Sequence, residues 1–301
     1  MEDHKLKVFC TVAETKSFSK TSEIIHLTQP AVSLQVQALE ETYEAKLFDR
    51  TSNSITLTPA GEILYKYAKD ILRLYAEAEK EIGKITGLIK GCVMVGGSTT
   101  IGNYVLPNVV VAFKNKHPKI KINVLIANTR KVEDLVTVGA IDFGLVESIP
   151  TRQKITIERL IEDELIVIVP SHHAWAKKKS VSIAELTKEP FIIREDGSGT
   201  RTFIETFLQE QGMQLSDLKI VMSLGGIESI KLAVENGSGV SIISKWAARK
   251  EIKYGTLKGL SFKEAPMLRN FSLILPKNAI INHAVDEFLT FLRSFNYDDL
   301  I

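Results

Sequence analysis

A long helical stretch from residue 59 to about residue 90 limits the possible folds of this 301-residue chain more than any other feature. The stretch has no proline after Pro59, and its apolar residues recur at alternating spacings of three and four. At 1.5 Å per residue such a helix is about 45 Å long, so we expect its apolar stripe to pack against a second copy of the chain. The alternative is that the stripe packs against the chain's own globular part. The stripe comprises Leu64, Tyr67, Ile71, Leu74 and Ala78.

The segment before this helix predicts three short helices within residues 5–43 and then a small hairpin. Ser19 is expected to cap the second helix and Thr28 the third. Pro30 falls in the first turn of the third helix, where its missing N–H has no partner to lose. Apolar spacing fixes the buried side of this helix. The outward face comprises Gln29, Ser33, Leu34 and Gln37, and over the first turns of the helix it is free of acidic residues.

The residues from 91 to 301 alternate near-continuous apolar strands with helical segments. This pattern is typical of an α/β fold with parallel sheets buried on both faces, and a stretch of this length is enough for two lobes. The expected strands lie near residues 93–96, 120–126, 141–146, 165–169, 191–194, 220–223, 240–244 and 271–275.

The order of several motifs identifies a family resemblance. TQPAVS, KLFDR and LTPAGE follow one another as in the winged helix-turn-helix of LysR-type transcriptional regulators, which residues 9–68 resemble. The remainder, with GGSTTIGNYVLP and EDGSGTR, is similar to that family's effector-binding domain. The spacing of its motifs is most similar to the branch that includes regulators of sulfur assimilation and sulfite response.

The resemblance implies three parts: a DNA-binding domain at 1–58, a linker and dimerisation helix at 59–90, and a periplasmic-binding-protein-like (type 2) effector domain at 91–301. In that domain it implies a lobe I of residues 91–161 and 266–301 and a lobe II of residues 162–265. It further implies a dimer or tetramer that binds promoter DNA and responds to a small molecule. RNA polymerase is a further candidate partner.

Side chains at the start of the third helix have the chemistry that reads base edges, because amides pair with adenine and apolar groups meet thymine methyls. Hydroxyls at helix starts suit phosphate oxygens, and the hairpin would reach the adjacent minor groove or its backbone. The expected DNA contacts are Ser17, Ser19, Thr28, Gln29, Pro30, Ser33, Leu34, Gln37, Arg50, Ser52 and Asn53. The alternative for Arg50 is an ion pair with Glu40 or Glu41.

Three positions depart from the family pattern. Leu34 and Gln37 stand where such helices often carry basic residues, and Glu44 stands where a glycine commonly ends the recognition helix. Residues 1–60 also contain six basic against eight acidic side chains. Fewer cationic phosphate contacts imply weaker salt-dependent affinity or more reliance on backbone N–H groups, the wing and DNA shape.

Two loops rich in glycine and hydroxyls, at residues 96–100 and 197–201, each follow a strand and open a helix. Free N–H groups at such helix starts suit an anion, whereas Thr202 in place of a third glycine excludes a dinucleotide motif. We therefore expect a small organic acid or an oxyanion of the sulfite or sulfate kind between the lobes; the alternative is that the loops are only helix caps and tight turns. The expected contacts are Ser98, Thr99, Thr100, Asn128, Thr129, Ser198, Gly199, Thr200, Arg201, Gly225 and Gly226.

Other function classes are disfavoured. The adjacent His172 and His173 lack a partner at metal-binding spacing, and no nucleophile elbow or HExxH motif occurs, so neither an enzyme nor a cofactor is expected. Cys10 and Cys92 form no CxxC pair and are expected to be buried apolar residues. A solute-binding protein without DNA function shares the bilobal fold, but it would have an export signal and no use for the first 90 residues. Apolar runs of about five residues exclude a membrane span, so we expect a cytoplasmic protein.

Overall fold

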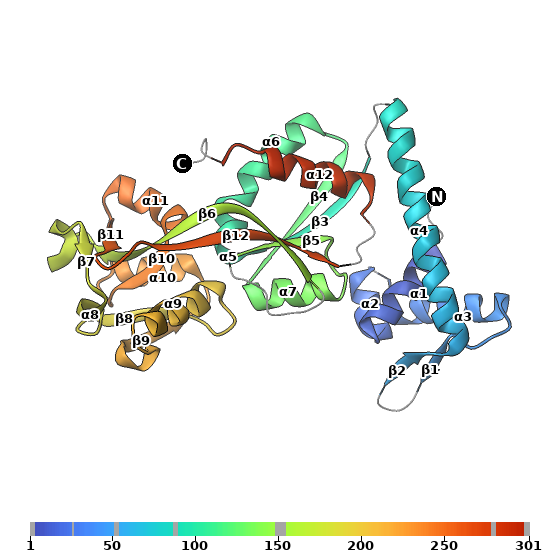
Figure 1. Ribbon diagram of the computed structural model, residues 1–301, viewed down its shortest axis with the longest axis horizontal. Helices are drawn as coiled ribbons and strands as arrows, with labels where there is room; N and C mark the ends of the chain where they lie inside the picture. Colours follow the sequence, from blue (N-terminus) through green and yellow to red (C-terminus); the bar gives the residue numbers. More distant parts are fainter. Residues whose placement is uncertain are drawn as a thin grey trace.

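A computed structural model shows three parts in chain order: a winged-helix domain, a long helix and a two-lobed α/β domain (Figure 1). It describes residues 4–25, 27–50, 54–86, 90–147, 155–277 and 281–297, without the side chains at positions 50 and 84. Within these ranges no helix is long and apolar enough to cross a lipid bilayer.

The N-terminal domain has the predicted three helices and hairpin. They are α1 (His4–Thr15), α2 (Phe18–Ile24), α3 (Gln29–Thr42), β1 (Phe48–Arg50) and β2 (Ile55–Leu57). The two strands pair antiparallel, with Phe48 opposite Leu57. Phe48 also packs against Phe9 and Phe18 at ring-centroid distances of 5.3 and 5.9 Å, so the hairpin is fixed to the helices through an aromatic core.

The predicted caps are correct for α3 and wrong for α2. Thr28 caps α3, and its hydroxyl accepts from the N–H of Ala31 at 3.4 Å. The cap of α2 is Ser17, which accepts from the N–H of Lys20 at 3.2 Å. Ser19 is instead the second residue of the helix. The helix begins at Phe18, whose side chain is buried, and so it starts before the position at which Ser19 was expected to cap it.

Glu44 ends α3 in the left-handed conformation that the family pattern assigns to glycine. Its φ is +48°, and the N–H of Ala45 bonds back to the carbonyl of Glu40 at 3.1 Å. This is the pattern of a Schellman cap. A side chain in this conformation is strained by about 1–2 kcal/mol.

Glu44→Gly is therefore expected to raise the free energy of unfolding by about 0.5–1 kcal/mol, because relief of the strain exceeds the added entropy of the unfolded chain. Urea denaturation of the full-length protein measures this change. Glu44→Ala is the control, since alanine keeps the Cβ and should not stabilise. An equal gain in both variants would show that loss of the carboxylate, and not the backbone, is responsible.

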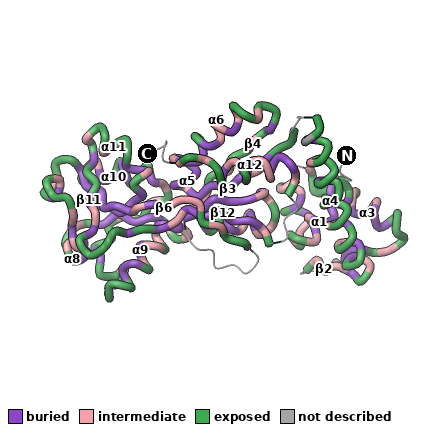
Figure 2. Tube along the Cα trace, turned by 45° about the horizontal axis from the view of Figure 1, so that its top comes forward, coloured by how far each residue is buried: buried purple, intermediate pink, exposed green. Residues whose placement is uncertain are grey.

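Helix α4 (Pro59–Thr86) carries two apolar faces. Leu64, Ala68 and Leu72 are buried in the core of the winged-helix domain, so the assignment of Leu64 to the intermolecular stripe is corrected. The other predicted members, Tyr67, Ile71, Leu74 and Ala78, are exposed. Much of α4 is exposed in Figure 2. Further exposed apolar residues along this helix are Ile63, Ile82 and Ile85.

All eight strands expected between residues 91 and 301 are present, and two further strands, β7 and β11, were not predicted. The strands are β3 (Gly91–Ser98), β4 (Ile120–Ala127), β5 (Phe143–Val146), β6 (Ile155–Pro170), β7 (Ser180–Val181), β8 (Pro190–Arg194), β9 (Lys219–Leu224), β10 (Ser241–Ser244), β11 (Leu257–Phe262) and β12 (Met267–Pro276). The helices are α5 (Thr99–Tyr104), α6 (Leu106–Lys116), α7 (Thr129–Thr137), α8 (Ile183–Leu186), α9 (Gly199–Glu210), α10 (Ile227–Glu235), α11 (Lys245–Tyr254) and α12 (His283–Ser294), with 3₁₀ turns η1 (Ala174–Lys177) and η2 (Leu215–Asp217).

The sheets are mixed, so the expectation of parallel sheets holds only in part. An eight-stranded sheet runs β4-β3-β5-β12-β6-β11-β7, with β10 also paired to β6, and β8 pairs with β9 separately. β3, β4 and β5 pair in parallel, as do β8 and β9. The long strands β6 and β12 are antiparallel and run through both lobes (Figure 1). They join the lobes because each strand contributes side chains to a core at either end.

Each lobe has helices on both faces of its sheet. In lobe I, α6 and α12 cover one face and α7 the other. In lobe II, α8 and α9 pack on one face of β6, and α10 and α11 on the other. β12 is buried over most of its length, whereas β6 is buried mainly in its second half (Figure 2). Asp163 on β6 and Arg269 on β12, which lie opposite each other where the strands cross between the lobes, are both buried.

The prediction that both cysteines are buried is correct for Cys10 and wrong for Cys92. Cys10 is enclosed in the winged-helix core, where burial and the nearby Glu14 raise the pKa of its thiol to about 12. Cys92 lies exposed near the start of β3, where the strand pairs with β4 and not yet with β5. Neither thiol is in a disulfide.

Candidate functional site

The outward face of α3 has the composition that the sequence predicted. Gln29 and Gln37 are exposed, and Leu34 is 65% exposed. The Gln29 amide donates to the hydroxyl of Ser33 at 3.1 Å. Pro30 is exposed beside them in the first turn. The first two turns of α3 therefore present amide, hydroxyl and apolar groups, the types that contact base edges in a major groove.

The first acidic residues of α3 lie near its C-terminal end. Glu41 accepts from the amide of Gln37 at 2.9 Å. Glu40 is buried and accepts from Lys46 Nζ at 2.8 Å and from the N–H of Leu47 at 2.9 Å. Burial tends to raise the pKa of Glu40, but these donors outweigh it and hold the pKa below its ordinary value. Glu40 thus fixes the start of the hairpin to α3.

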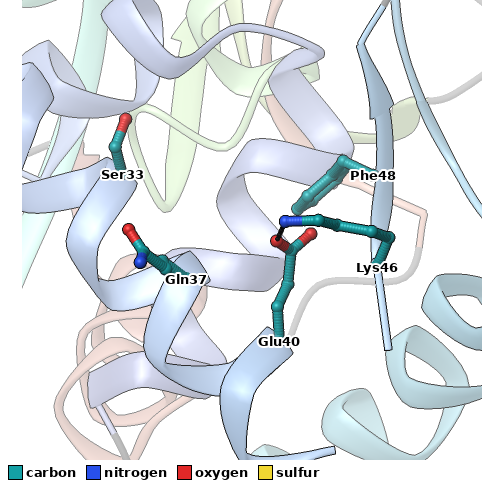
Figure 3. A pocket seen from close by; sticks show the side chains of 5 residues that line it. All are labelled: Ser33, Gln37, Glu40, Lys46 and Phe48. Atoms are coloured by element: carbon teal, nitrogen blue, oxygen red, sulfur yellow. Dashed lines mark hydrogen bonds and ion pairs between the residues drawn. The ribbon is translucent and has the colours of Figure 1, made fainter. Parts of the chain in front are cut away.

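A depression of about 350 Å³ lies between α3 and the hairpin (Figure 3). It is lined by Ser33, Gln37, Glu40, Lys46 and Phe48. The Lys46 ammonium reaches across to Glu40 in this view. The side chain of Arg50 and residues Ser52 and Asn53 lie outside the described residues.

In the α/β domain, the two predicted loops come together around a buried carboxylate, Glu147. Glu147 follows β5 and is 3% exposed. Its Oε1 accepts from the N–H of Thr100 at 3.1 Å, and its Oε2 accepts from the hydroxyl of Thr129 at 3.0 Å. From lobe II, Gly199 lies so close that a Cβ on it would be 3.2 Å from Glu147 Oε2. Residues from both lobes therefore enclose this carboxylate.

Two buried arginines flank the same region. Arg194, at the end of β8, donates to the hydroxyl of Thr99 at 2.9 Å and pairs with Glu195. Arg269, on β12, donates through Nε to Asp163 at 2.7 Å and through Nη1 to the hydroxyl of Thr200 at 3.0 Å. The predicted hydroxyl residues Thr99 and Thr200 are therefore each engaged by an arginine.

The charges around Glu147 explain its titration. Burial tends to raise the pKa of Glu147, but the positive charge of Arg269 and the neighbouring hydroxyls of Ser98, Thr100 and Thr129 outweigh it, and the pKa is lowered. Asp163 differs, because burial raises its pKa and Arg269 offsets only part of that effect. The region between the lobes thus favours a negative charge at the position of Glu147.

The other predicted contacts lie around this centre. Asn128 and Ser198 cap α7 and α9 with their side chains, and Gly226 caps α10 with extended backbone. Gly225 has open space beside its Cα. Arg201 pairs with Glu205 along α9 at 2.9 Å, so its charge is already matched within lobe II.

The charged residues that lie between the two loops were not predicted from the sequence: they are Glu147, Asp163, Arg194, Glu195 and Arg269. Charged residues inside otherwise apolar strands were the available signal, since Asp163 lies in β6, and Arg269 in β12. Such residues need a partner when buried. Across the described part of the chain, no cluster of side chains suited to a metal ion occurs.

Comparisons with known proteins match both halves of the chain. A family model described as "Bacterial regulatory helix-turn-helix protein, lysR family" matches residues 4–62, and "LysR substrate binding domain" matches residues 86–296. The HTH-type transcriptional regulator CysL of Bacillus subtilis is 32% identical over 292 residues, which cover 97% of this chain and 96% of CysL.

Solved structures share the fold. A full-length OxyR variant from Pseudomonas aeruginosa superposes with a TM-score of 0.67 at 19% identity, covering 96% of this chain and 94% of that chain. The regulatory domain of CcmR from Synechocystis PCC6803, solved in complex with 2-PG, gives a TM-score of 0.63 at 24% identity, covering 68% of this chain and 97% of that domain.

Proposed function

Because the chain belongs to the family of LysR-type transcriptional regulators, we propose that its α3 reads operator DNA and that a small anion bound between its two lobes modulates this activity. The observation that carries the anion proposal is the convergence of Thr100, Thr129 and Arg269 on a buried negative charge. The proposal keeps the sequence-based limits of 1–58, 59–90 and 91–301 for the three parts.

The DNA contacts are proposed from the exposed face of α3 and from the wing. An exposed amide at Gln29 suits a base edge, whereas Arg50 on β1 suits a phosphate. The capping hydroxyls of Ser17 and Thr28, the exposed Ser19, and Ser52 and Asn53 complete the proposed set. The small number of cations implies that DNA shape and backbone N–H groups contribute to affinity.

Gln29→Ala is expected to weaken operator binding by about 1–3 kcal/mol and to relax preference at one base step. Arg50→Ala is expected to weaken binding to all sequences and to reduce the salt slope by about one. Footprinting and gel shift on DNA upstream of the protein's own gene, at several salt concentrations, measure both effects. Gln211→Ala, an exposed glutamine in lobe II, is the control. Unchanged operator binding in both variants would show that the exposed face of α3 and Arg50 do not contact the operator. Absence of any sequence-specific gel shift would favour a solute-binding protein.

The effector is proposed to be an organic acid or an inorganic oxyanion. Backbone N–H groups, hydroxyls and arginine can satisfy several anion oxygens, and such charge-assisted bonds are the stronger ones. The CcmR domain, which shares this fold, was solved in complex with 2-PG. The expected donors here are Thr99, Thr100, Thr129, Thr200 and Arg269. Arg201 is a weaker candidate than the sequence suggested, because Glu205 already neutralises it.

A thermal-shift screen of carboxylates and oxyanions on the full-length protein tests this site. A ligand at about 100 times its dissociation constant should stabilise the protein by roughly 2.7 kcal/mol. Thr99→Ala and Thr200→Ala should each remove most of that shift, because each removes a hydroxyl held by a buried arginine. Thr206→Ala, on the exposed side of α9, should retain it. A shift that survives both variants, or a response to neutral apolar compounds alone, would contradict the anion site.

A further inference from the structure

The carboxylate of Glu147 is bound as an external anion would be. One oxygen accepts from the backbone N–H of Thr100 and the other from the hydroxyl of Thr129. The positive charge of Arg269 adds to this stabilisation. Thr100 and Thr129 lie in lobe I and Arg269 on a crossing strand, so the carboxylate sits at the junction between the lobes.

Several buried polar atoms around this carboxylate lack a well-formed hydrogen bond. Ser98 Oγ, Thr100 Oγ1 and Arg269 Nη2 are buried and make no hydrogen bond of ordinary geometry among the described residues, although the hydroxyls of Ser98 and Thr100 lie close enough to Glu147 to help lower its pKa. Ser98 and Thr100 are 0% exposed, and Arg269 is 3% exposed. Leaving such atoms unpaired is unfavourable, so donors in this number indicate a site built for more oxygen atoms than one carboxylate supplies.

Lobe II closes over the carboxylate at Gly199. A Cβ at this position would lie 2.6 Å from the hydroxyl of Thr129 and 3.2 Å from Glu147 Oε2. Any other residue type would therefore displace the side chains of Thr129 and Glu147 here. Further contacts hold this closure, including the N–H of Arg130 to the carbonyl of Gly197 at 3.2 Å. The lobes are thus closed around an anion that belongs to the chain.

We propose that Glu147 is an internal anion that occupies the effector site, so that a carboxylate or oxyanion effector binds there only by displacing it. This inference rests on the proposed function, and it identifies the group with which the effector competes. An effector with more than two oxygens could also satisfy Ser98, Thr100 and Arg269 Nη2, which the Glu147 carboxylate leaves without a well-formed hydrogen bond. These additional hydrogen bonds would allow a larger anion to bind in place of the Glu147 carboxylate.

The test removes the internal carboxylate and supplies a free one. In the full-length protein, Glu147→Ala leaves a space lined by the same donors, and formate is a small carboxylate that fits such a space. About 50 mM sodium formate should raise the Tm of Glu147→Ala by about 3 °C or more relative to sodium chloride of equal ionic strength. Wild type should shift by less than about 1 °C, because Glu147 already fills the site.

Two further variants control for charge and volume. Glu147→Gln removes the charge but keeps the space filled, so formate should leave its Tm unchanged. Glu251→Ala removes a carboxylate from the ion pair with Lys231 in lobe II and should not respond to formate either. If Glu147→Ala is folded only when formate is present, the proposal is also supported.

The proposal is overturned if formate shifts Glu147→Ala no more than chloride does, or if that variant stays unfolded in both salts. Equal stabilisation of wild type and Glu147→Ala by formate would also overturn it, because formate would then bind at another site. Regulation of the protein by an anion could still hold in that case. Failure of the proposed function has a separate signature, because wild-type protein would then give no sequence-specific operator shift whatever formate does.

Discussion

Replacing Arg269 with methionine is expected to lower the free energy of unfolding by about 3–5 kcal/mol, the largest effect on stability of any substitution considered for this chain. Arg269 is 3% exposed and its Nε lies 2.7 Å from Asp163 Oδ2. Asp163 is 1% exposed, and Glu147 depends on the same positive charge. Methionine has a similar volume but no charge, so two buried carboxylates lose their counter-ion.

Thermal unfolding of the full-length variant should show this loss as a decrease of about 6–20 °C for the transition of the effector domain. The double variant Arg269→Met with Asp163→Asn is the matched control. It removes one of the two unpaired charges, so it should recover part of the stability. A decrease of less than about 1 kcal/mol in the single variant would show that water reaches this region.

The stability lost in Arg269→Met should also depend on pH, and it should be smaller at acidic pH. In the wild type the pKa of Glu147 is lowered, so its contribution to stability is present above the unfolded pKa and is lost as pH falls through the folded pKa. Without Arg269 that pKa rises, and protonation relieves the unpaired charge. The difference between wild type and Arg269→Met should therefore be smaller at about pH 5 than at about pH 7.

Features fixed by neighbouring residues could be predicted from the sequence. Thr28 and Pro30 lie within one turn of each other, and together they set the start of α3. The cap of α2 was misplaced because Ser17 and Ser19 are equivalent by local pattern. Packing of Phe18 against Phe48 decides between them, and that contact spans 30 residues.

The candidate effector site shows the same limit more strongly. Its hydroxyl loops were predictable, because each is a local unit of strand, loop and helix. Its charges were not, because Asp163 meets Arg269 only through the register of β6 with β12. Arg201 was chosen for its place in the loop motif, but Glu205 lies four residues away on the same helix and pairs with it.

The spacing of apolar residues also predicted an apolar stripe on α4. It did not show which apolar residues pack on the winged-helix domain and which stay exposed. Leu64 belongs to the stripe that packs on the winged-helix domain. The exposed stripe has no cover among the described residues: Tyr67 and Leu74 are each 57% exposed, and Ile82 is 60% exposed. An apolar face of this length in water favours association. We therefore propose that this stripe forms the dimer.

Ile71→Asp is expected to convert the oligomer to monomer at micromolar concentration. Ile71 lies at the centre of the exposed stripe, so a dimer would bury one unpaired carboxylate from each copy. An uncompensated buried charge costs about 3–5 kcal/mol, so even one of the two carboxylates raises the dissociation constant by roughly a thousandfold. Sedimentation velocity measures the change. Lys66→Asp places the same side chain on the polar side of α4 and should leave the oligomer intact.

Loss of the dimer should also weaken operator binding, although α3 is unchanged in Ile71→Asp. A dimer binds two half-sites about one helical turn apart, and a monomer keeps only one of them. The winged-helix domain itself should remain folded, because Leu64, Ala68 and Leu72 on the other stripe still cover its core. Far-UV circular dichroism close to that of the wild type, together with loss of the operator shift, would therefore assign the defect to association. An intact oligomer in Ile71→Asp would place the dimer contact elsewhere on the molecule.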